Sequence, residues 1–303
     1  MYEGILPIWK EKGMTSHDVV FKLRKLLKMK KIGHTGTLDP EVEGVLLICL
    51  GKATKLVEFM MDGHKIYQGE ICVGYSTTTE DATGEIIEQK KLDHPINDKD
   101  IDDQMRSFTG EIIQVPPMYS AVKVNGKKLY EYARQNIPVE RPQRTAQIFE
   151  FKRTSDTQFD ALQGTQSWSF YVNCGKGTYI RTLAVDLGRA LGYPAHMSTL
   201  VRYATGGFNK DQTLTLNQVA DYVDNQTIDQ FIYPMEAAHL PFRKIRLTKD
   251  QYTEIQFGKR LPRDYFGETL MDIVQLIFEE QLIAIYYPHP NKEEFIKPMK
   301  MFI

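Results

Sequence analysis

The chain has 303 residues, of which 42% are hydrophobic and 25% are charged, as is usual for a soluble globular protein. Its formal net charge of −1 gives no global signature of nucleic-acid binding. No apolar run approaches the roughly 20 residues that cross a bilayer, and residues 1–10 do not resemble a signal peptide. We therefore expect a cytoplasmic protein without a membrane partner.

The cysteines and histidines do not indicate a metal site or a disulfide framework. Cys49, Cys72 and Cys174 lie far apart in apolar or strand-like stretches, which is typical of buried thiols. The seven histidines show no spacing that is characteristic of metal ligands. We therefore expect no bound metal.

The first third of the chain predicts a helix followed by alternating strands and helices. Thr15–Asp18 has the pattern of a capping box, and apolar residues then recur at helical spacing as far as Leu27. Residues 45–50 form an apolar run that predicts a buried strand, and residues 53–61 predict a helix. Residues 66–74 roughly alternate, as a strand does.

The middle of the chain contains a strong hairpin signal. Asn125-Gly126 between residues 121–124 and 127–129 predicts a type I′ turn. A short helix over 130–135 is expected to follow. Residues 167–174 alternate as a strand, and Thr178 is the predicted cap of a helix that ends near Gly192. Because strands and helices mix throughout, the pattern favours an α/β or α+β domain.

A second, smaller domain is predicted at the C-terminal end. The chain turns polar from about residue 211 to 241, with a short helical pattern over 216–223. Strand-like runs follow, notably 270–278 and 282–287. We therefore predict a catalytic domain over residues 1–242 and a small, mostly β domain over 243–303.

Positive charge is concentrated locally, although the chain as a whole is nearly neutral. Such patches can bind RNA, but they are equally often solvated surfaces. The first cluster is Lys22, Arg24, Lys25, Lys28, Lys30 and Lys31; the second is Lys123, Lys127, Lys128, Arg134, Arg141 and Arg144.

The most informative stretch is GHTGTLDP at residues 33–40, which continues as EGVLLICLGKATK at 43–55. Asp39 precedes a proline, where helical backbone is disfavoured and an exposed turn is expected. Alone, this pattern more often marks a simple turn than a catalytic carboxylate.

The stretch closely resembles the catalytic motif of the TruB family of pseudouridine synthases, in which GHTGxLDP runs on to GxLxxxxGxATK. Four further segments agree with that family in order and spacing, and together they span most of residues 1–208. They are KIY at 65–67, VPPMYSAVK at 115–123 with GKKLYEYA at 126–133, GTYIR at 177–181, and LVR at 200–202.

The resemblance implies a catalytic role for three residues. Asp39 is expected to be the nucleophile, because isomerisation breaks the bond from the ribose to the base nitrogen and a carboxylate can assist that step covalently or at the sugar. Arg181 is expected to keep Asp39 charged. Tyr67 is expected to stack on the target uracil.

The resemblance also implies a set of substrate-binding residues. His34 is expected to fill the space that the flipped uridine leaves, because a target inside a folded loop must be turned out before it can react. Leu200 is expected to line the uracil pocket, and Asp81 to orient groups in the site. Tyr179 lies in the GTYIR segment and is included with them.

The fold implied by the resemblance is α+β: a pseudouridine synthase fold with a mixed, mainly antiparallel sheet and flanking helices, followed by a PUA-like domain. A thumb-like insertion at about 120–150 is expected to bring Lys127 and Lys128 to RNA phosphates. The expected substrate is the T-arm of tRNA at uridine 55. We expect no cofactor, because neither a redox change nor phosphoryl transfer occurs, and we expect a monomer.

Two alternatives share some of these features. A tRNA folding chaperone without turnover would keep the basic clusters and the insertion but would not need Asp39, Tyr67 and Arg181 together. A guide-RNA-dependent pseudouridine synthase would share the aspartate motif, but the short N-terminus and the intact insertion argue against it.

Overall fold

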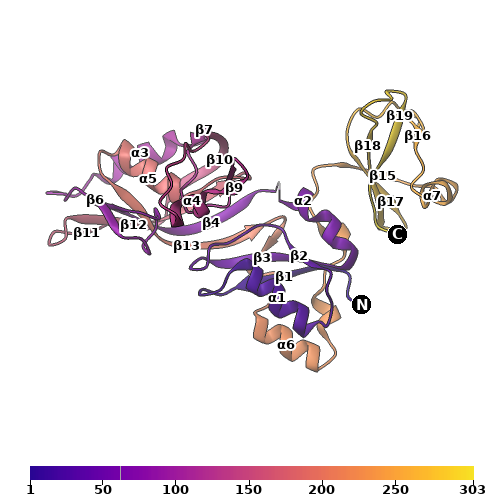
Figure 1. The fold of residues 1–303 in the computed structure, drawn as a ribbon, viewed down its shortest axis with the longest axis horizontal. Coiled ribbons are helices and arrows are strands. Elements are labelled where there is room, and N and C mark those ends of the chain that lie inside the picture. The colour runs from indigo at the N-terminus through magenta and orange to yellow at the C-terminus, as the bar shows by residue number, and fades with distance from the viewer. Residues whose placement is uncertain (62) are drawn as a thin grey trace.

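One large sheet dominates the fold (Figure 1). The computed structural model describes residues 1–61 and 63–303. Within these residues, ten strands share this sheet in the principal order β1-β3-β13-β4-β12-β10-β7, while β2 pairs with β3, β11 with β12 and β14 with β13. The strands are β1 (Gly4–Lys10), β2 (Ile32–His34), β3 (Glu43–Leu50), β4 (Lys65–Val73), β7 (Gly110–Gln114), β10 (Arg144–Arg153), β11 (Gln158–Asp160), β12 (Thr165–Cys174), β13 (Ala195–Thr205) and β14 (Phe208–Asn209).

The sheet is mixed and mainly antiparallel, as predicted. Among its described strands the contact between β13 and β3 is parallel, and the other pairings are antiparallel. In the centre, Tyr67 of β4 lies opposite Val172 of β12 on one side and opposite Arg202 of β13 on the other. This register brings three sequence segments together at the middle of the sheet.

The flanking helices cover the two halves of the sheet separately. On one half, α1 (Ser16–Leu26) and α6 (Leu216–Asp224) share an apolar core with β1 and β3. On the other half, α3 (Asp98–Ser107) and α5 (Ile180–Ala190) share a core with β4, β10 and β12. Figure 1 shows α1 and α6 beside one part of the sheet and α3 and α5 beside the other. The prediction of flanking helices is therefore confirmed.

Several local predictions are confirmed because they rest on short-range chemistry. The capping box is present: the Asp18 N–H donates to the Thr15 hydroxyl, and the Thr15 N–H donates to the Asp18 carboxylate. Asn125 and Gly126 both have positive φ and connect β8 (Lys123–Val124) to β9 (Lys127–Lys128), as a type I′ hairpin requires. The short helix that follows is α4 (Leu129–Arg134).

Two local predictions were wrong in detail. Residues 53–61 do not form one α-helix, because a 3-10 helix (Gly51–Leu56) precedes the single turn of α2 (Val57–Met60). Thr178 does not cap α5: its hydroxyl donates to the carbonyl of Gly175, and Tyr179 occupies the N-cap position. The side chain of Gln114 bonds both backbone groups of Tyr179, which fixes the start of the helix one residue later.

A second, five-stranded sheet follows, with the strand order β15-β17-β18-β19-β16. It is the small, mostly β, PUA-like domain that the sequence predicted. Its elements are β15 (Arg243–Arg246), α7 (Lys249–Ile255), β16 (Leu261–Pro262), β17 (Val274–Phe278), β18 (Gln281–Pro288) and β19 (Phe295–Met301).

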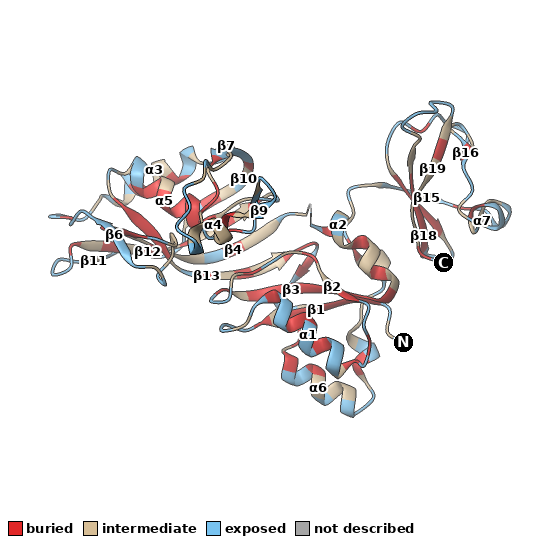
Figure 2. Cartoon of the chain, in the orientation of Figure 1, coloured by how far each residue is buried: buried red, intermediate tan, exposed pale blue. Residues whose placement is uncertain are grey.

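The second sheet has an apolar core of its own. It also packs against the part of the large sheet that contains β1 and β3. Ile277, Leu282 and Phe302 lie in one apolar cluster with Ile5 and Val45. Figure 2 shows buried residues along the strands of both sheets. Between β4 and α3, β5 (Tyr75–Thr77) and β6 (Ile86–Gln89) form a separate two-stranded sheet. Across the described residues, no helix has the length and apolar character that a membrane span needs.

Candidate active site

The loop that carries Asp39 connects β2 to β3 and is held from both ends. The backbone of Leu38 exchanges two hydrogen bonds with the hydroxyl of Ser16 at the start of α1. The N–H of Val42 donates to the carbonyl of Asp39 and closes a turn. As a result Leu38 is buried, whereas the side chain of Asp39 remains 46% exposed. The local structure therefore presents this carboxylate at the surface.

Lys10, which the sequence did not single out, supports the same loop. This lysine is fully buried, and its ammonium group donates to the carbonyls of Glu11, Met14 and Pro40. Burial lowers the pKa of Lys10 to about 8, although the charge of Asp39 opposes that change. A lone lysine at the end of a strand carries no sequence signal for such a contact, since lysine is usually exposed.

Arg181 is the partner of Asp39. Its Nη2 lies 3.0 Å from Asp39 Oδ2, and its side chain is only 8% exposed. The same guanidinium donates to the carbonyls of Thr79 and Tyr119, each at 2.9 Å. Arg181 lies in the first turn of α5, and Gln114 fixes that turn through the backbone of Tyr179. A planar group held at several points can keep one orientation toward a carboxylate.

Asp81 is a second carboxylate close to Arg181, with Oδ2 at 4.0 Å from Nη1. Its other oxygen accepts hydrogen bonds from the hydroxyls of Thr79 and Thr83 and from the N–H of Thr83. These three bonds orient Asp81 in its turn. Arg181 therefore faces two carboxylates, of which Asp39 is the nearer and the more exposed.

Tyr67 and Leu200 lie in the apolar cluster that also contains Leu38 and Val42 of the aspartate loop. Both are nearly buried, at 8% exposure. Burial raises the pKa of Tyr67, and the neighbouring charge of Arg202 partly offsets that rise. The phenol is therefore neutral near pH 7, and a flat, uncharged ring lies next to the loop that presents Asp39.

Arg202 belongs to the LVR segment, but its contacts could not be inferred from the sequence. It is 1% exposed, and it donates to the carbonyls of Val45, at 2.8 Å, and Gly36, at 3.2 Å. Gly36 lies in the aspartate loop, so Arg202 attaches this loop to β13. Burial, and then the charge of Arg202, lowers the pKa of His34, which keeps that imidazole neutral.

Lys127 and Lys128 form β9, on the hairpin of the insertion. Their ammonium groups lie over the rings of Tyr132 and Tyr130, at 6.0 Å and 5.4 Å from the ring centroids. The structure thus places Arg181 3.0 Å from Asp39 and 4.0 Å from Asp81. It puts Tyr67 and Leu200 in the apolar cluster of the aspartate loop, and the two lysines on the hairpin. Among the residues that the structure describes, no three side chains of histidine, cysteine, aspartate or glutamate lie together in a way that could hold a metal ion.

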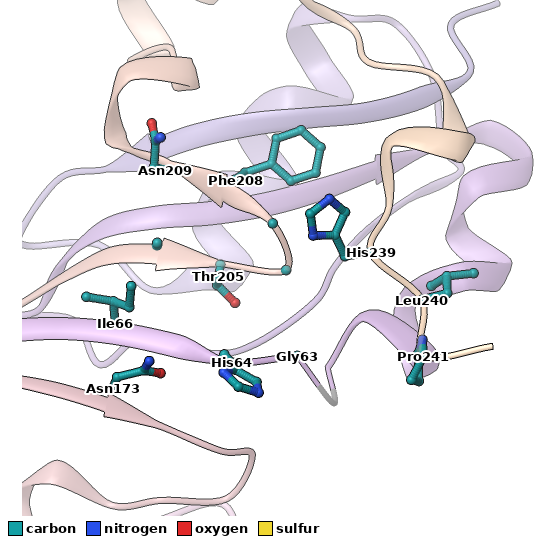
Figure 3. Close-up of a pocket in the computed structure, with 13 residues that line it drawn as sticks. Gly63, His64, Ile66, Asn173, Thr205, Phe208, Asn209, His239, Leu240 and Pro241 are labelled. Atoms are coloured by element: carbon teal, nitrogen blue, oxygen red, sulfur yellow. The ribbon is translucent and has the colours of Figure 1, made fainter. Parts of the chain in front are cut away.

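A cavity of about 750 Å³ lies elsewhere, near the start of β4 (Figure 3). It is lined by residues that include His64, Ile66, Asn173, Thr205 and His239, and by none of the predicted site residues. Ile66 and Asn173 are cross-strand partners next to the pair of Tyr67 and Val172. Because successive residues of a strand point to opposite faces, this cavity lies on the face of the sheet opposite to the side chain of Tyr67.

Comparison with known proteins places this site in a family. Residues 24–180 match the model described as TruB family pseudouridylate synthase (N terminal domain), and residues 181–239 match the tRNA pseudouridylate synthase B C-terminal domain. The chain is 49% identical over 306 residues to tRNA pseudouridine synthase B of Staphylococcus saprophyticus, with 100% of both chains covered. It is 50% identical over 299 residues to the protein of that name from Listeria innocua, covering 98% of this chain and 97% of the relative.

A solved structure agrees with these matches. The crystal structure of a Cbf5–Nop10–Gar1 complex aligns with a TM-score of 0.74 and 27% identity, and covers 99% of this chain and 85% of that one. The fold, with Asp39 and Arg181 paired beside its central strands, is that of a pseudouridine synthase. The chain belongs to the TruB family of pseudouridylate synthases.

Proposed function

We propose that this protein converts the uridine at position 55 of the tRNA T-loop to pseudouridine, with Asp39 as the nucleophile. The observation that carries the proposal is the ion pair of 3.0 Å between Asp39 and the buried Arg181. Relatives that match the whole chain at about half identity are named tRNA pseudouridine synthase B, which supports tRNA as the substrate.

The chemistry requires a charged carboxylate that can reach the substrate. The guanidinium of Arg181 lies 3.0 Å from the carboxylate of Asp39, and the exposed side of Asp39 leaves it open to a nucleotide. Asp39 then assists cleavage of the bond between the ribose and the base nitrogen, either by covalent attack or through a proton step at the sugar. The base turns and rejoins the ribose through carbon 5. No electron or phosphoryl group is exchanged with a cofactor in this scheme.

Base flipping follows from the position of the target in a folded loop. Extruding a nucleotide costs a few kcal/mol of stacking, which contacts in the site must offset. Tyr67 supplies a neutral ring for stacking on uracil, and Leu200 an apolar wall. His34 is the last residue of β2, directly before the loop of Asp39, and burial lowers its pKa, which suits a neutral ring that replaces the extruded base.

The insertion and the C-terminal domain are proposed to hold the rest of the tRNA. Lys127 and Lys128 would contact phosphates of the T-arm. The described strands of the large sheet end at Asn209 and those of the second sheet begin at Arg243, and we keep residues 242 and 243 as the proposed boundary.

The experiment uses an unmodified tRNA transcript labelled with tritium at carbon 5 of its uridines. Rejoining through carbon 5 expels that hydrogen, so the purified protein should release one equivalent of tritium per transcript. A transcript in which cytidine replaces the T-loop uridine should release none. Release from both transcripts would contradict position 55, and release from neither would contradict the enzymatic function.

The same assay separates the alternatives. The similarity to a structure of Cbf5 in complex with Nop10 and Gar1 gives a specific reason to consider an activity that needs components beyond this chain, such as a guide RNA. The proposed enzyme works with protein and transcript alone, whereas a guided enzyme would need an added guide RNA. A chaperone without turnover would bind the transcript tightly and release no tritium.

A further inference from the structure

Glu80 occupies an unusual position between two residues that contact Arg181. It follows Thr79, whose carbonyl accepts a hydrogen bond from Arg181, and precedes Asp81, which faces the same guanidinium. The backbone of Glu80 has a φ of 64°, in the left-handed region that a glutamate rarely adopts. Strained backbone of this kind persists where several contacts hold it, and such positions are common at functional sites.

The side chain of Glu80 contacts two other parts of the molecule. Its Oε2 accepts a hydrogen bond of 2.9 Å from the hydroxyl of Thr182, the residue after Arg181 on α5. Its Oε1 lies 3.6 Å from Nη1 of Arg141. The Glu80 side chain is 17% exposed, and burial raises its pKa, while Thr182, Arg181 and Arg141 oppose that rise. A carboxylate in this setting depends on its cationic neighbours to remain charged.

Arg141 lies near the end of the thumb segment, which we define as residues 115–143, between β7 and β10. It also donates to the carbonyl of Pro116 near the start of that segment, at 3.2 Å. A few residues further on, the carbonyl of Tyr119 accepts a hydrogen bond from Arg181 itself. Both ends of the thumb segment therefore attach to the group around Arg181, one directly and the other through Glu80.

We propose that Glu80 and Arg141 form a positioning pair, which transmits the placement of the thumb segment to Arg181 and thereby to Asp39. The path consists of contacts already described: Arg141 to Glu80, Glu80 to Thr182 and to the backbone that holds Arg181, and Arg181 to Asp39. The inference rests on the proposed function and deepens it. The pair acts on the conversion of bound tRNA rather than on its affinity, because neither side chain needs to contact RNA for this role.

A double-mutant cycle measures this coupling. The single-turnover rate of tritium release and the dissociation constant for tRNA are determined for Glu80→Gln, Arg141→Met and the double variant. We expect each single change to lower the rate about tenfold, and the double variant to match the slower single variant, because both changes break the same link. The dissociation constant should change less than about twofold, and Arg141→Lys, which keeps the charge, should recover most of the rate.

The matched control is the ion pair of Arg153 on β10 with Asp102 on α3, which has two contacts of 3.0 Å and comparable burial. Its variants Arg153→Met and Asp102→Asn should leave the rate unchanged. The positioning pair would be overturned if the Glu80 and Arg141 variants released tritium at the unmodified rate, or if the rate losses of the two single variants added up in the double variant. A change in the dissociation constant without a change in rate would also overturn it. Absence of release by the unmodified protein would instead contradict the proposed function, so the two failures are distinguishable.

Discussion

Replacing Arg181 with methionine removes the cationic partner of Asp39 while keeping an unbranched side chain. The change abolishes the ion pair of 3.0 Å and the two hydrogen bonds to the carbonyls of Thr79 and Tyr119. Truncating one partner of a buried charge pair costs about 2–5 kcal/mol. Because the side chain of Asp39 is 46% exposed, water recovers part of that loss, and we take the lower half of the range.

We assign this loss to the transition state of the chemical step, where about 2 to 3 kcal/mol corresponds to a fall in rate on the order of 100-fold, since each 1.4 kcal/mol is tenfold. The assay is single-turnover tritium release with enzyme in excess over the labelled transcript, together with a filter-binding measurement of tRNA affinity. We expect the rate to fall by that amount while the affinity changes less than about threefold. Arg181→Lys should be intermediate, because an ammonium keeps the charge but cannot make all three contacts at once.

The matched control is Arg189→Met on the same helix. Arg189 is 73% exposed, and its ion-pair partner among the described residues is Asp186, one turn earlier, so its removal should leave rate and affinity unchanged. Thermal unfolding of each variant checks that the protein remains folded at the assay temperature. Equal losses of rate and affinity in Arg181→Met, or an effect of the same size in Arg189→Met, would refute the assignment of Arg181 to the chemical step.

Two further predictions concern binding and stability. Lys127→Gln combined with Lys128→Gln should reduce the slope of log affinity against log salt by about 1 to 2, as expected for two lost phosphate contacts; an unchanged slope would remove the hairpin from the RNA-binding surface. The pKa of Lys10 is about 8 in the folded protein, against 10.5 for an ordinary lysine in the unfolded chain. Between these two pH values the unfolded chain binds one more proton than the folded protein, so the free energy of unfolding increases as the pH rises. The unfolding free energy of the protein relative to Lys10→Met should therefore increase from pH 8 to 10.5 in chemical denaturation, and a flat difference would contradict the shift.

Short-range chemistry made part of the fold predictable from the sequence. The capping box at Thr15 and Asp18 and the turn at Asn125 and Gly126 each use groups within four residues of one another, and both are present. Thr178 shows the limit of such signals. Its hydroxyl suits an N-cap, but Gln114, which is distant in sequence, bonds the backbone of the next residue and fixes the helix start there.

The site was predictable to the extent that its residues lie in continuous motifs. Asp39 and Arg181 each belong to such a motif, and the structure pairs them. Lys10 and Arg202 were missed because their role consists of hydrogen bonds to carbonyls of other segments, which no spacing reveals. Lysine and arginine are seldom buried, so a sequence pattern alone predicts that Lys10 and Arg202 are exposed surface charges.

The most direct test of the account is the replacement of Asp39 by asparagine, which keeps the size of the side chain and removes the charge. With the T-loop uridine labelled, tritium release should fall by at least about 100-fold, the lower end for a positioned catalytic group, while tRNA binding is retained. Glu41→Gln, an exposed carboxylate two residues away, is the control and should retain full activity. Release by Asp39→Asn at a rate close to that of the unmodified protein would contradict the catalytic role of Asp39.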